Sequence, residues 1–500
     1  MDLFRYTKDE REELVDVFQI SRGEYTIVNE NEDFIIAYLK EPTIKFDDGF
    51  LSVSTMFPRD FSAVRRFYTS TWSRVNATLK FYYVSADKTV NYLLDGLKRV
   101  DQNLNFDLYV EPIPNRNYHE VHDGIISALK SIGVEGNKAN IIVGGVLGPA
   151  PLESYFFEKV KALSIINHTP THLININKLD NIVSECKNMS NPSRLHGCRA
   201  FRAYILNNIV QLYAKAGGIP WIPGEERLLG RMAIVGIATA RMKISNREEY
   251  VVGAAFSIAY LGKEIRSYIT ASIYDRSNLD EDLIKSKGIY VPRETIESLI
   301  SKIADVYNKW QINQYIIFQS PMVHSEELIG LKEALYGRKW VLVHVKTTGF
   351  SKRVYDKNTL DWGPYRGMCI LDKDYVNAFG KRGIVKAILA STGRVKIRRG
   401  GEDVEEVLYK ATPRPLELEI YIDPVDAKNY KEPSKLAMYI SRLVLLLGKL
   451  DWEAYTNWPK KPFVIKYAQR LAQVIARIDE ETRKRLLNTL TSSVALRFIM

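Results

Sequence analysis

Two pairs of residues that can bind an anionic group occur at a spacing of four along segments that the sequence predicts to be helical. Tyr155 and Lys159 lie in LESYFFEKVKALSII, and Gln211 and Lys215 lie in FRAYILNNIVQLYAKAGG. Residues four apart share one face of an α-helix. An ordinary exposed face explains the first pair equally well. A cation in the last turn of a helix also explains Lys215, because it complements the helix dipole without any ligand.

A second candidate site is suggested by a side chain that is absent. Residues 231–243, RMAIVGIATARMK, form an apolar run bounded by charges, which predicts a strand buried on both faces. Toward its end, around Ala238, the run contains mostly small residues, at a place where many enzymes have a carboxylate. The strand is therefore either a core strand or a catalytic strand that has lost its acid.

The elements around these residues divide the chain into two halves. From residue 75 to about 224, strands alternate with helices, which predicts a parallel sheet in an α/β sandwich, and GGIPWIPGEE then marks a boundary. From about 225, three consecutive strands precede a helix, a strand, a helix and a strand. That order is typical of an RNase H-like domain, and helices follow to the end.

Composition sets limits on the kind of protein. The chain has 500 residues, 46% of them hydrophobic, and a formal charge of +11, which fits two to four domains and a polyanionic partner. The three scattered cysteines predict no disulfide framework and a reducing compartment. The charged N-terminus does not resemble a secretory signal, and Arg442 and Lys449 interrupt the most apolar helix. We expect a soluble, cytoplasmic protein.

Two other motifs do not predict cofactor sites. His119 and His122 are three residues apart, whereas a zinc helix of the HExxH type needs its histidines four apart. The segment IIVGGVLGPAP follows a strand, but Val143 stands where a dinucleotide-binding loop has its first glycine. We expect neither a nucleotide cofactor nor a catalytic metal.

The order of the polar pairs carries a family resemblance. Tyr-x-x-x-Lys, then HTPTH, then Gln-x-x-x-Lys-x-Gly-Gly-x-Pro-Trp resembles the pocket that holds the 5′ end of the guide in Argonaute MID domains. By resemblance, Tyr155 stacks on the first base, and Lys159, Gln211 and Lys215 hold the 5′-phosphate. His172 stands where the family has a glutamine. In many members the terminal carboxylate, here Met500, helps to coordinate a metal ion at this phosphate, which implies Mg²⁺ there.

The second half resembles a PIWI domain along its whole length. The matching segments are RMAIVGIATARM, QYIIFQSPMVHSEELIGLKEAL, ATPRPLELEIYIDP and KLDWEAYTNWPKKPFVIKYAQRLAQVIA. The chain is similar to a short prokaryotic, archaeal-type Argonaute, with a Rossmann-like MID domain at 75–224 and an RNase H-like PIWI domain at 225–500. A small α+β segment at 1–74 has no counterpart in these two domains.

Active PIWI domains hold two divalent metals with carboxylates from the first strand, the fourth strand and the last helix, because each ion needs fixed anionic ligands. In this sequence the three positions carry Ala238, Ser320 and Gln469. Gln319 stands where an arginine is common. The resemblance therefore implies a protein that has lost the catalytic metal site.

Three functions remain to be distinguished. The favoured one is a guide-binding protein that recognises complementary nucleic acid, RNA or DNA, without cutting it, and that acts in defence against invading nucleic acid through a separate protein effector. The second is an active nuclease with relocated acids drawn from Asp275, Asp280 and Asp282. The third is a structural partner that binds no guide.

Overall fold

The computed structural model describes most of the chain in separate stretches. These are residues 24–46, 51–52, 77–84, 89–95, 106–113, 118–135, 141–148, 155–186, 198–225, 228–243, 249–261, 264–275, 291–320, 322–347, 354, 363–399, 402–407, 415–428, 430–452 and 461–490. The helix expected near the N-terminus and the arginine- and aromatic-rich stretch 57–74 lie outside the described residues.

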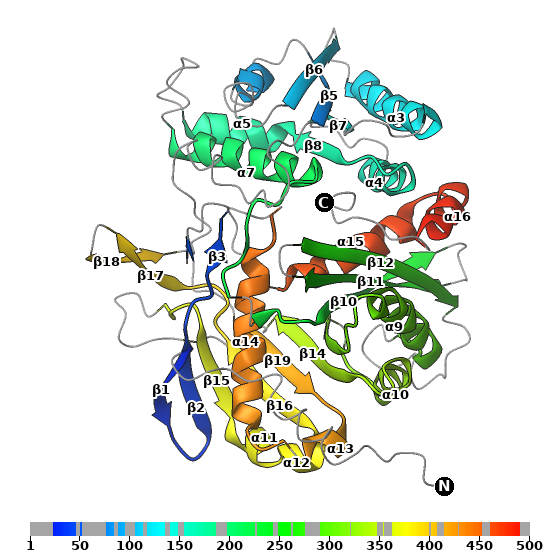
Figure 1. Cartoon of the computed structure of the whole chain (residues 1–500). Helices are drawn as coiled ribbons and strands as arrows, with labels where there is room; N and C mark the ends of the chain where they lie inside the picture. Colours follow the sequence, from blue (N-terminus) through cyan, green and yellow to red (C-terminus); the bar gives the residue numbers. More distant parts are fainter. Residues whose placement is uncertain are drawn as a thin grey trace.

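A ten-stranded sheet organises the second half of the chain (Figure 1). Its first elements follow the order predicted from the sequence: β10 (Ala233–Lys243), β11 (Glu249–Leu261), β12 (Glu264–Asp275), α9 (Arg293–Asn308), β13 (Gln314–Gln319), α10 (Ser325–Ala334) and β14 (Lys339–Thr347). The first three strands pair antiparallel, whereas β13 pairs parallel with both β10 and β14. The prediction of three antiparallel strands followed by a helix, a strand, a helix and a strand is confirmed.

The rest of this sheet is antiparallel and includes strands from the N-terminal segment. In sheet order these strands are β19 (Leu416–Tyr421), β16 (Ile384–Leu389), β15 (Met368–Asp372), β2 (Phe34–Leu39) and β1 (Tyr25–Glu30). A short hairpin, β17 (Arg394–Arg399) with β18 (Glu402–Val407), stands apart from it. The two N-terminal strands therefore extend the large sheet, and β1 forms its outer edge.

Helices cover the two faces of the ten-stranded sheet. Apolar side chains of α14 (Pro433–Lys449) and α15 (Phe463–Arg477) pack on one face, and those of α9 and α10 pack on the other. The helix α15 lies very close to β10, because a Cβ atom at Gly236 would collide with the backbone of Val464. Glycine is thus required in the middle of β10, and the start of α15 is fixed against this strand.

The first half of the chain forms a second, four-stranded sheet. Its order is β6 (Phe106–Ile113), β5 (Ala77–Val84), β7 (Ile141–Leu147) and β8 (Thr171–Asn175), and all three pairings are parallel, as the alternation predicted. Its helices are a segment at 89–95, α3 (Tyr118–Glu135), α4 (Phe156–Ile166), α5 (Ile176–Glu185) and α7 (Arg199–Lys215). The helix α5 was not predicted from the sequence.

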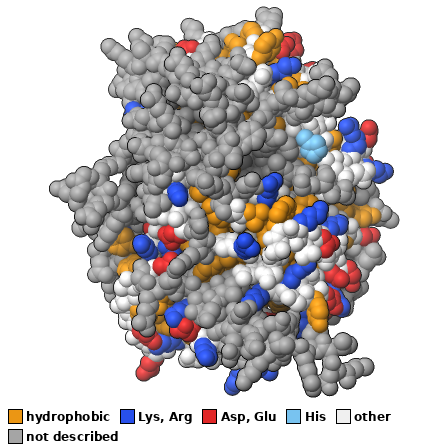
Figure 2. Space-filling view, in the orientation of Figure 1, with side chains coloured by type: hydrophobic (Ala, Val, Ile, Leu, Met, Phe, Trp, Pro, Cys, Tyr) orange, Lys and Arg blue, Asp and Glu red, His pale blue; other side chains and the backbone are white. Residues whose placement is uncertain are grey.

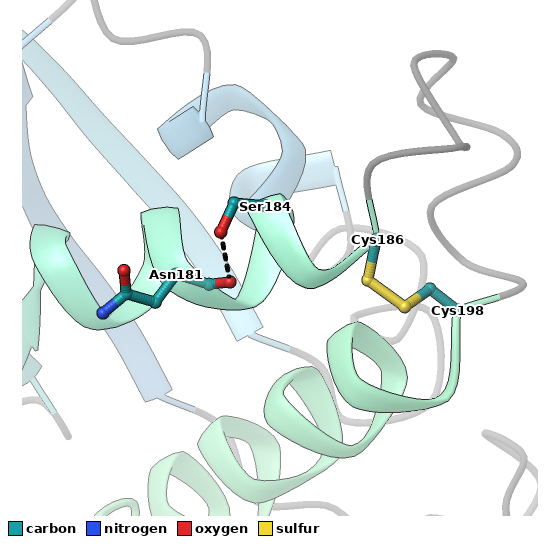
Figure 3. Close-up of a disulfide and its surroundings, with 4 residues drawn as sticks. All are labelled: Asn181, Ser184, Cys186 and Cys198. Atoms are coloured by element: carbon teal, nitrogen blue, oxygen red, sulfur yellow. Dashed lines mark hydrogen bonds between the residues drawn. A yellow bond between two sulfur atoms is a disulfide. The ribbon is translucent and has the colours of Figure 1, made fainter.

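A disulfide joins Cys186 to Cys198 at the ends of α5 and α7 (Figure 3). The two Cα atoms lie 6.0 Å apart, within the range that a disulfide spans. Our prediction of no disulfide was therefore wrong. The cysteine count was uninformative because the pairing is decided by two helix ends that meet in space. Cys369 is buried and forms no disulfide.

The two halves are joined through a buried tryptophan and a group of buried charges. Trp221 donates its indole N–H to the carbonyl of Lys449 at 2.8 Å, and the following β9 (Ile222–Pro223) pairs with β3 (Ile44–Lys45), which also pairs with β4 (Leu51–Ser52). The ammonium group of Lys449 lies 2.7 Å from Glu41. Arg442, fully buried, pairs with Glu24 and Glu225.

These ion pairs explain the charges that interrupt the most apolar helix. Arg442 and Lys449 neutralise carboxylates brought by the N-terminal segment and by the junction between the halves. Within the described stretches, the structure has no helix that is both long enough and apolar enough to traverse a lipid bilayer.

Candidate nucleic-acid-binding site

The residues of the first candidate site come from α4, β8 and α7. Lys215, in the last turn of α7, lies with its Nζ atom 3.3 Å from Nδ1 of His172 on β8. Nε2 of His172 lies 3.0 Å from Oδ1 of Asn208. An ammonium group can only donate, so His172 accepts at Nδ1, donates from Nε2 and is a neutral ring in this chain of contacts.

The three residues of this hydrogen-bonded series, Lys215, His172 and Asn208, are all buried. Asn208 completes the chain by donating from Nδ2 to the carbonyl of Tyr204 at 2.8 Å. Buried polar groups are costly unless they are hydrogen-bonded, so the network fixes the direction in which Lys215 points. The structure thus brings together two of the residues predicted from the sequence, and it adds Asn208, which the sequence did not indicate.

Gln211 and Lys215 lie near the C-terminal end of the helix α7, whose two ends are both well defined. Gln211 is partly exposed one turn before the buried Lys215. The helix is followed by Gly217, whose φ of 95° lies in the left-handed region that favours glycine. Cys198 caps the other end of the helix and ties it to α5. The disulfide thus ties the start of α7 to the end of α5, and the glycine follows the helix just after Lys215.

Tyr155 is presented by a strained backbone at the start of α4. Its φ is 88°, unusual for any residue other than glycine, and its side chain is 53% exposed. Such backbone strain tends to occur where binding requires it. The guanidinium carbon of Arg477, on α15, lies 5.9 Å from the centre of the Tyr155 ring. Arg477 is held there by Glu158, 2.7 Å away.

Lys159 lies on α4 and faces the second half of the chain, whereas Tyr155, which we expected on the same helix, precedes α4 in a left-handed conformation. Asp479, the N-cap of α16 (Glu480–Thr489), has a lowered pKa. Hydrogen bonds from Thr482 are the largest cause, and the nearby charge of Lys159 contributes. The helix α4 packs against α15 and α16. The Tyr155–Lys159 pair therefore lies where the two halves of the chain meet.

The described side chains of this site suit direct binding of a phosphate. Tyr155, Lys159, His172, Gln211 and Lys215 include two ammonium groups and no carboxylate, so these five residues alone do not fit a bound divalent cation. Met500, whose terminal carboxylate would assist a metal ion, lies outside the described residues. Mg²⁺ at this place stays a prediction.

The second candidate site lies at neighbouring positions of β10 and β13. The parallel pairing of Ile237 with Gln319 places Ala238 and Ser320, one residue further on, side by side. Ala238 is buried and Ser320 is partly exposed. Gln469 is exposed on α15, the helix that packs on β10. The three positions therefore come from the two adjacent strands and the covering helix.

A lysine that the sequence did not single out contacts this site. Lys461, two residues before α15, donates from Nζ to Oγ of Ser320 at 2.7 Å. Burial lowers the pKa of Lys461. Among the described residues, no carboxylate forms an ion pair with it. The side chain of Lys461 is thus held directly against Ser320.

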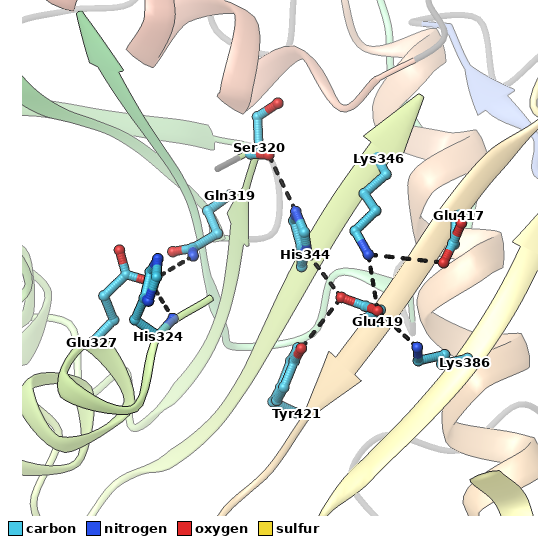
Figure 4. A network of polar contacts seen from close by, with 10 residues as sticks. All are labelled: Gln319, Ser320, His324, Glu327, His344, Lys346, Lys386, Glu417, Glu419 and Tyr421. Atoms are coloured by element: carbon cyan, nitrogen blue, oxygen red, sulfur yellow. Dashed lines mark hydrogen bonds and ion pairs between the residues drawn. The ribbon is translucent and has the colours of Figure 1, made fainter. Parts of the chain in front are cut away.

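Behind Ser320 lies a network of charged residues centred on Glu419 (Figure 4). Nδ1 of His344 lies 2.8 Å from Glu419, and Nε2 of the same ring lies 3.2 Å from the carbonyl oxygen of Ser320. Both of these partners are acceptors, so a doubly protonated His344 satisfies both contacts. Lys346 and Lys386 each lie 2.9 Å from the second oxygen of Glu419.

The cations around Glu419 determine its titration. Burial alone would raise the pKa of Glu419, but hydrogen bonds from His344, Lys386 and Lys346 outweigh burial and hold the pKa far below its ordinary value. The network connects β14, β16 and β19 to the carbonyl at the end of β13. A signal for it was present in the sequence, since Glu417, Glu419 and Tyr421 alternate with apolar residues along one strand.

Gln319 contributes to a separate contact on the other side of Ser320. It donates from Nε2 to Glu327 at 3.0 Å, and the same carboxylate accepts from the backbone N–H groups of Val291 and His324. Burial raises the pKa of Glu327. This buried carboxylate therefore orders the loop after β13 (Figure 4).

Of the relocated acids of the nuclease alternative, Asp275 lies in a described strand and is not close to Ala238. Asp275 ends β12, two strands away from β10 and four residues beyond the position in register with Ala238. At ~4.8 Å per strand and ~3.3 Å per residue, the two Cα atoms lie about 16 Å apart. Asp280 and Asp282 lie outside the described residues. Asp275 is thus too distant to hold a metal ion together with Ser320.

The surface between the two halves combines apolar and basic side chains. In the orientation of Figure 1, Figure 2 shows hydrophobic side chains across the middle of this face with separate Lys and Arg side chains among them. On the contact between α4 and α15, Arg470 lies over the rings of Phe157 and Tyr467 at 5.8 Å from each centre. These contacts fasten α4 to α15, because Tyr467 is buried and Arg470 lies between rings of both helices.

Comparison with known proteins identifies the fold. No protein-family model and no curated protein matches the sequence. Among solved structures, the A. aeolicus Argonaute matches 88% of this chain and 53% of its own length, with a TM-score of 0.53 and 15% identity. The Kluyveromyces polysporus Argonaute with a guide RNA matches 93% of this chain and 57% of its own length, with a TM-score of 0.54 and 11% identity.

One further solved structure shows which part of an Argonaute this chain is similar to. The C-terminal lobe of a budding yeast Argonaute is covered completely and matches 97% of this chain, with a TM-score of 0.53 and 10% identity. The chain spans about half the length of the two longer Argonaute structures. It has a mixed α/β fold that matches the C-terminal lobe of Argonaute proteins.

Proposed function

We propose that this protein binds a guide oligonucleotide by its 5′-phosphate and recognises complementary nucleic acid without cutting it. In this proposal residues 75–224 act as a MID domain of Rossmann-like type, and residues 225–500 act as an RNase H-like PIWI domain. The observation that carries the proposal is the buried chain Lys215–His172–Asn208, in a fold that one solved relative uses with a guide RNA.

The pocket derives its specificity from charge and from stacking. Lys215 is aligned by a neutral histidine, so its charge is not cancelled by His172. Lys159 adds a second ammonium group from α4. Tyr155, exposed on its strained backbone, offers a ring to a terminal base. An aromatic ring contributes to binding of any base because every base has a π-face.

The absence of cleavage is part of the proposal. Two-metal hydrolysis requires several anionic ligands around each ion. Alanine offers none, and Ser320 donates or accepts as a neutral hydroxyl that is already engaged by Lys461. With Gln469 at the third position, we infer that guide and target are held but the target strand is not hydrolysed.

A protein that binds without cutting needs another protein to act on the target. We propose that such an effector docks on the N-terminal segment 1–74, and that the pair acts in defence against invading nucleic acid. In the described part of that segment, β1 is the outer strand of the ten-stranded sheet and exposes Ile27 and Val28. Outer strands can pair with a strand of another protein.

The test is a binding comparison between two oligonucleotides of one sequence. The 5′-phosphorylated form should bind more tightly than the 5′-hydroxyl form, because only the former offers the charged group that Lys215 and Lys159 hold. Equal affinity for both forms would exclude the pocket. Sequencing the nucleic acid that copurifies from native cells would show whether the guide is RNA or DNA.

A further inference from the structure

Lys461 and Ser320 form a pair of hydrogen-bond donors that the guide pocket does not use. Nζ of Lys461 donates to Oγ of Ser320 at 2.7 Å. An ammonium group has three N–H donors, so this contact leaves others free to reach a ligand. A serine hydroxyl that accepts also keeps its own hydrogen. Both groups can therefore donate to one shared acceptor.

Both groups are held in place by the surrounding fold. The carbonyl of Ser320 accepts from His344, which Glu419 fixes from the other side. Lys461 precedes α15, whose first turn lies directly against β10 at Gly236. The pair is thus positioned by β13, β14, β19 and α15 rather than by a surface loop alone.

The charges around the pair favour an anion and disfavour a divalent cation. Lys461 is partly buried, and none of the described carboxylates forms an ion pair with it. It also stands before the N-terminus of α15, where the helix dipole is positive. A negative group there would offset both the ammonium charge and the dipole, whereas a metal ion would be repelled by both.

We propose that Lys461 and Ser320 bind a phosphodiester group of the target strand, so that a protein cation takes the place of the metal ions of a cutting enzyme. The inference rests on the proposed function, because it takes the strand paired with the guide as the ligand. Target binding by the guide-loaded protein is accordingly independent of divalent metal. Ammonium–phosphate contacts are charge-assisted and strong enough to matter for affinity.

The test measures guide and target affinities separately for the full-length protein. The variants are Lys461→Met, Lys461→Arg and a matched control, Lys484→Met, which removes an exposed lysine paired with Glu480. Each is loaded with a 5′-phosphorylated guide and titrated with complementary target, with EDTA and with Mg²⁺. Lys461→Met should weaken target binding about tenfold or more and leave guide affinity unchanged. The arginine and control variants should match the wild type.

Salt dependence gives a second readout. Loss of one phosphate contact should reduce the slope of log affinity against log salt by about 0.9 for a duplex. If Lys461→Met fails to fold, Ser320→Asp tests the same idea, because its carboxylate would pair with Lys461 and occupy the ammonium group. That variant should lose target affinity to a similar degree, in EDTA as well as in Mg²⁺.

Three results would overturn the inference. One is unchanged target affinity in Lys461→Met, which would leave the lysine as a structural donor to Ser320. Another is an equal loss of guide and target affinity. The third is target binding by the guide-loaded wild type that requires Mg²⁺ although guide binding does not. Failure of the wild type to bind a 5′-phosphorylated guide would instead refute the proposed function, before the target titrations begin.

Discussion

Lys215 Nζ lies 3.3 Å from Nδ1 of His172, and this contact joins the last turn of α7 to the strand β8. Sequence reasoning placed both residues in one pocket, with His172 in the place of a glutamine. The structure gives the histidine a definite role, since a neutral ring can accept from the lysine and donate onward to Asn208. The alternative explanation for Lys215, a cation that complements the dipole in the last turn of a helix, agrees with its place in α7 but does not account for its contact with His172.

The pocket predicts a selective loss of affinity for phosphorylated guides. Lys159→Ala and Lys215→Ala should each weaken a 5′-phosphorylated guide by about 10- to 150-fold, the value of one charge-assisted contact. A 5′-hydroxyl guide should be nearly unaffected. Binding isotherms for both guides at two salt concentrations check this, with the exposed Lys130→Ala on α3 as the matched control.

Tyr155 should behave differently from the lysines in the same assay. Replacement by alanine should weaken both guides alike, by about 1–3 kcal/mol, because stacking does not depend on the phosphate. Tyr155→Phe should keep the wild-type affinity. A loss restricted to the phosphorylated guide would contradict stacking as the role of this ring.

No metal-dependent cleavage should occur. A guide-loaded preparation incubated with complementary target and Mg²⁺ or Mn²⁺ should leave the target intact, because Ala238, Ser320 and Gln469 cannot supply an anionic metal site. The products are resolved on a denaturing gel beside a preparation purified in parallel from cells that lack the protein. Cutting at a fixed distance from the 5′ end of the guide, above that background, would contradict this prediction.

The outer strand β1 should mediate capture of an effector. Ile27→Lys and Val28→Lys add charge to exposed positions of this strand and should abolish copurification of a stoichiometric protein from the native host. Guide affinity should not change. A matched change on another exposed apolar residue, Val425→Lys in α13 (Pro424–Ala427), should leave copurification intact. A wild type that purifies alone, even when guide-loaded, would count against an effector.

The Glu419 network should make stability depend on pH in the acid range. Glu419→Gln removes the charge that His344, Lys346 and Lys386 share, and should cost about 3 kcal/mol near neutral pH, as for a broken buried ion pair. The folded pKa of Glu419 lies below its ordinary value of 4.5, so its contribution is full above 4.5 and declines as pH falls below it. Urea unfolding of both proteins across this range should show the difference shrinking.

Lys449 should make stability rise with pH in the alkaline range as well. Burial lowers its pKa from 10.5 to about 8, against the attraction of Glu41. Between these two values the unfolded chain binds more protons at this side chain than the folded chain does, so stability should rise with pH. The rise should be absent in Lys449→Met and present in Lys484→Met. Denaturant unfolding at pH values on either side of 8 measures it.

The parts of the fold that were predictable from sequence are those with strong local patterns. The apolar run of β10 and the two strands after it indicated their own positions, and the alternation in residues 75–224 indicated a parallel sheet. The N-terminal strands were harder to place, because nothing in the sequence of residues 25–39 indicates that β2 pairs with β15 and that β1 pairs with β2.

The parts of the sites that were missed depend on contacts between distant residues. In the sequence, Lys461 is one of two adjacent lysines before a proline. Only its position beside Ser320 in the structure indicates a role for it. His344, Lys386 and Glu419 lie on three separate strands. The disulfide was missed because Cys186 and Cys198, twelve residues apart, carry no recognised metal or redox spacing.

The pairing of Glu24 with Arg442 has a consequence for how the chain is made. These residues are 418 positions apart in the sequence. The strand β2 likewise gains β15, its second neighbouring strand in the sheet, only when that much later part of the chain has been synthesised. At about 5–20 residues per second, a ribosome needs about 20–80 seconds to synthesise the chain between Glu24 and Arg442. For that time the nascent chain carries the unneutralised Glu24 and an unpaired strand edge. Synthesis of this protein should therefore be sensitive to the supply of chaperones that shield such edges.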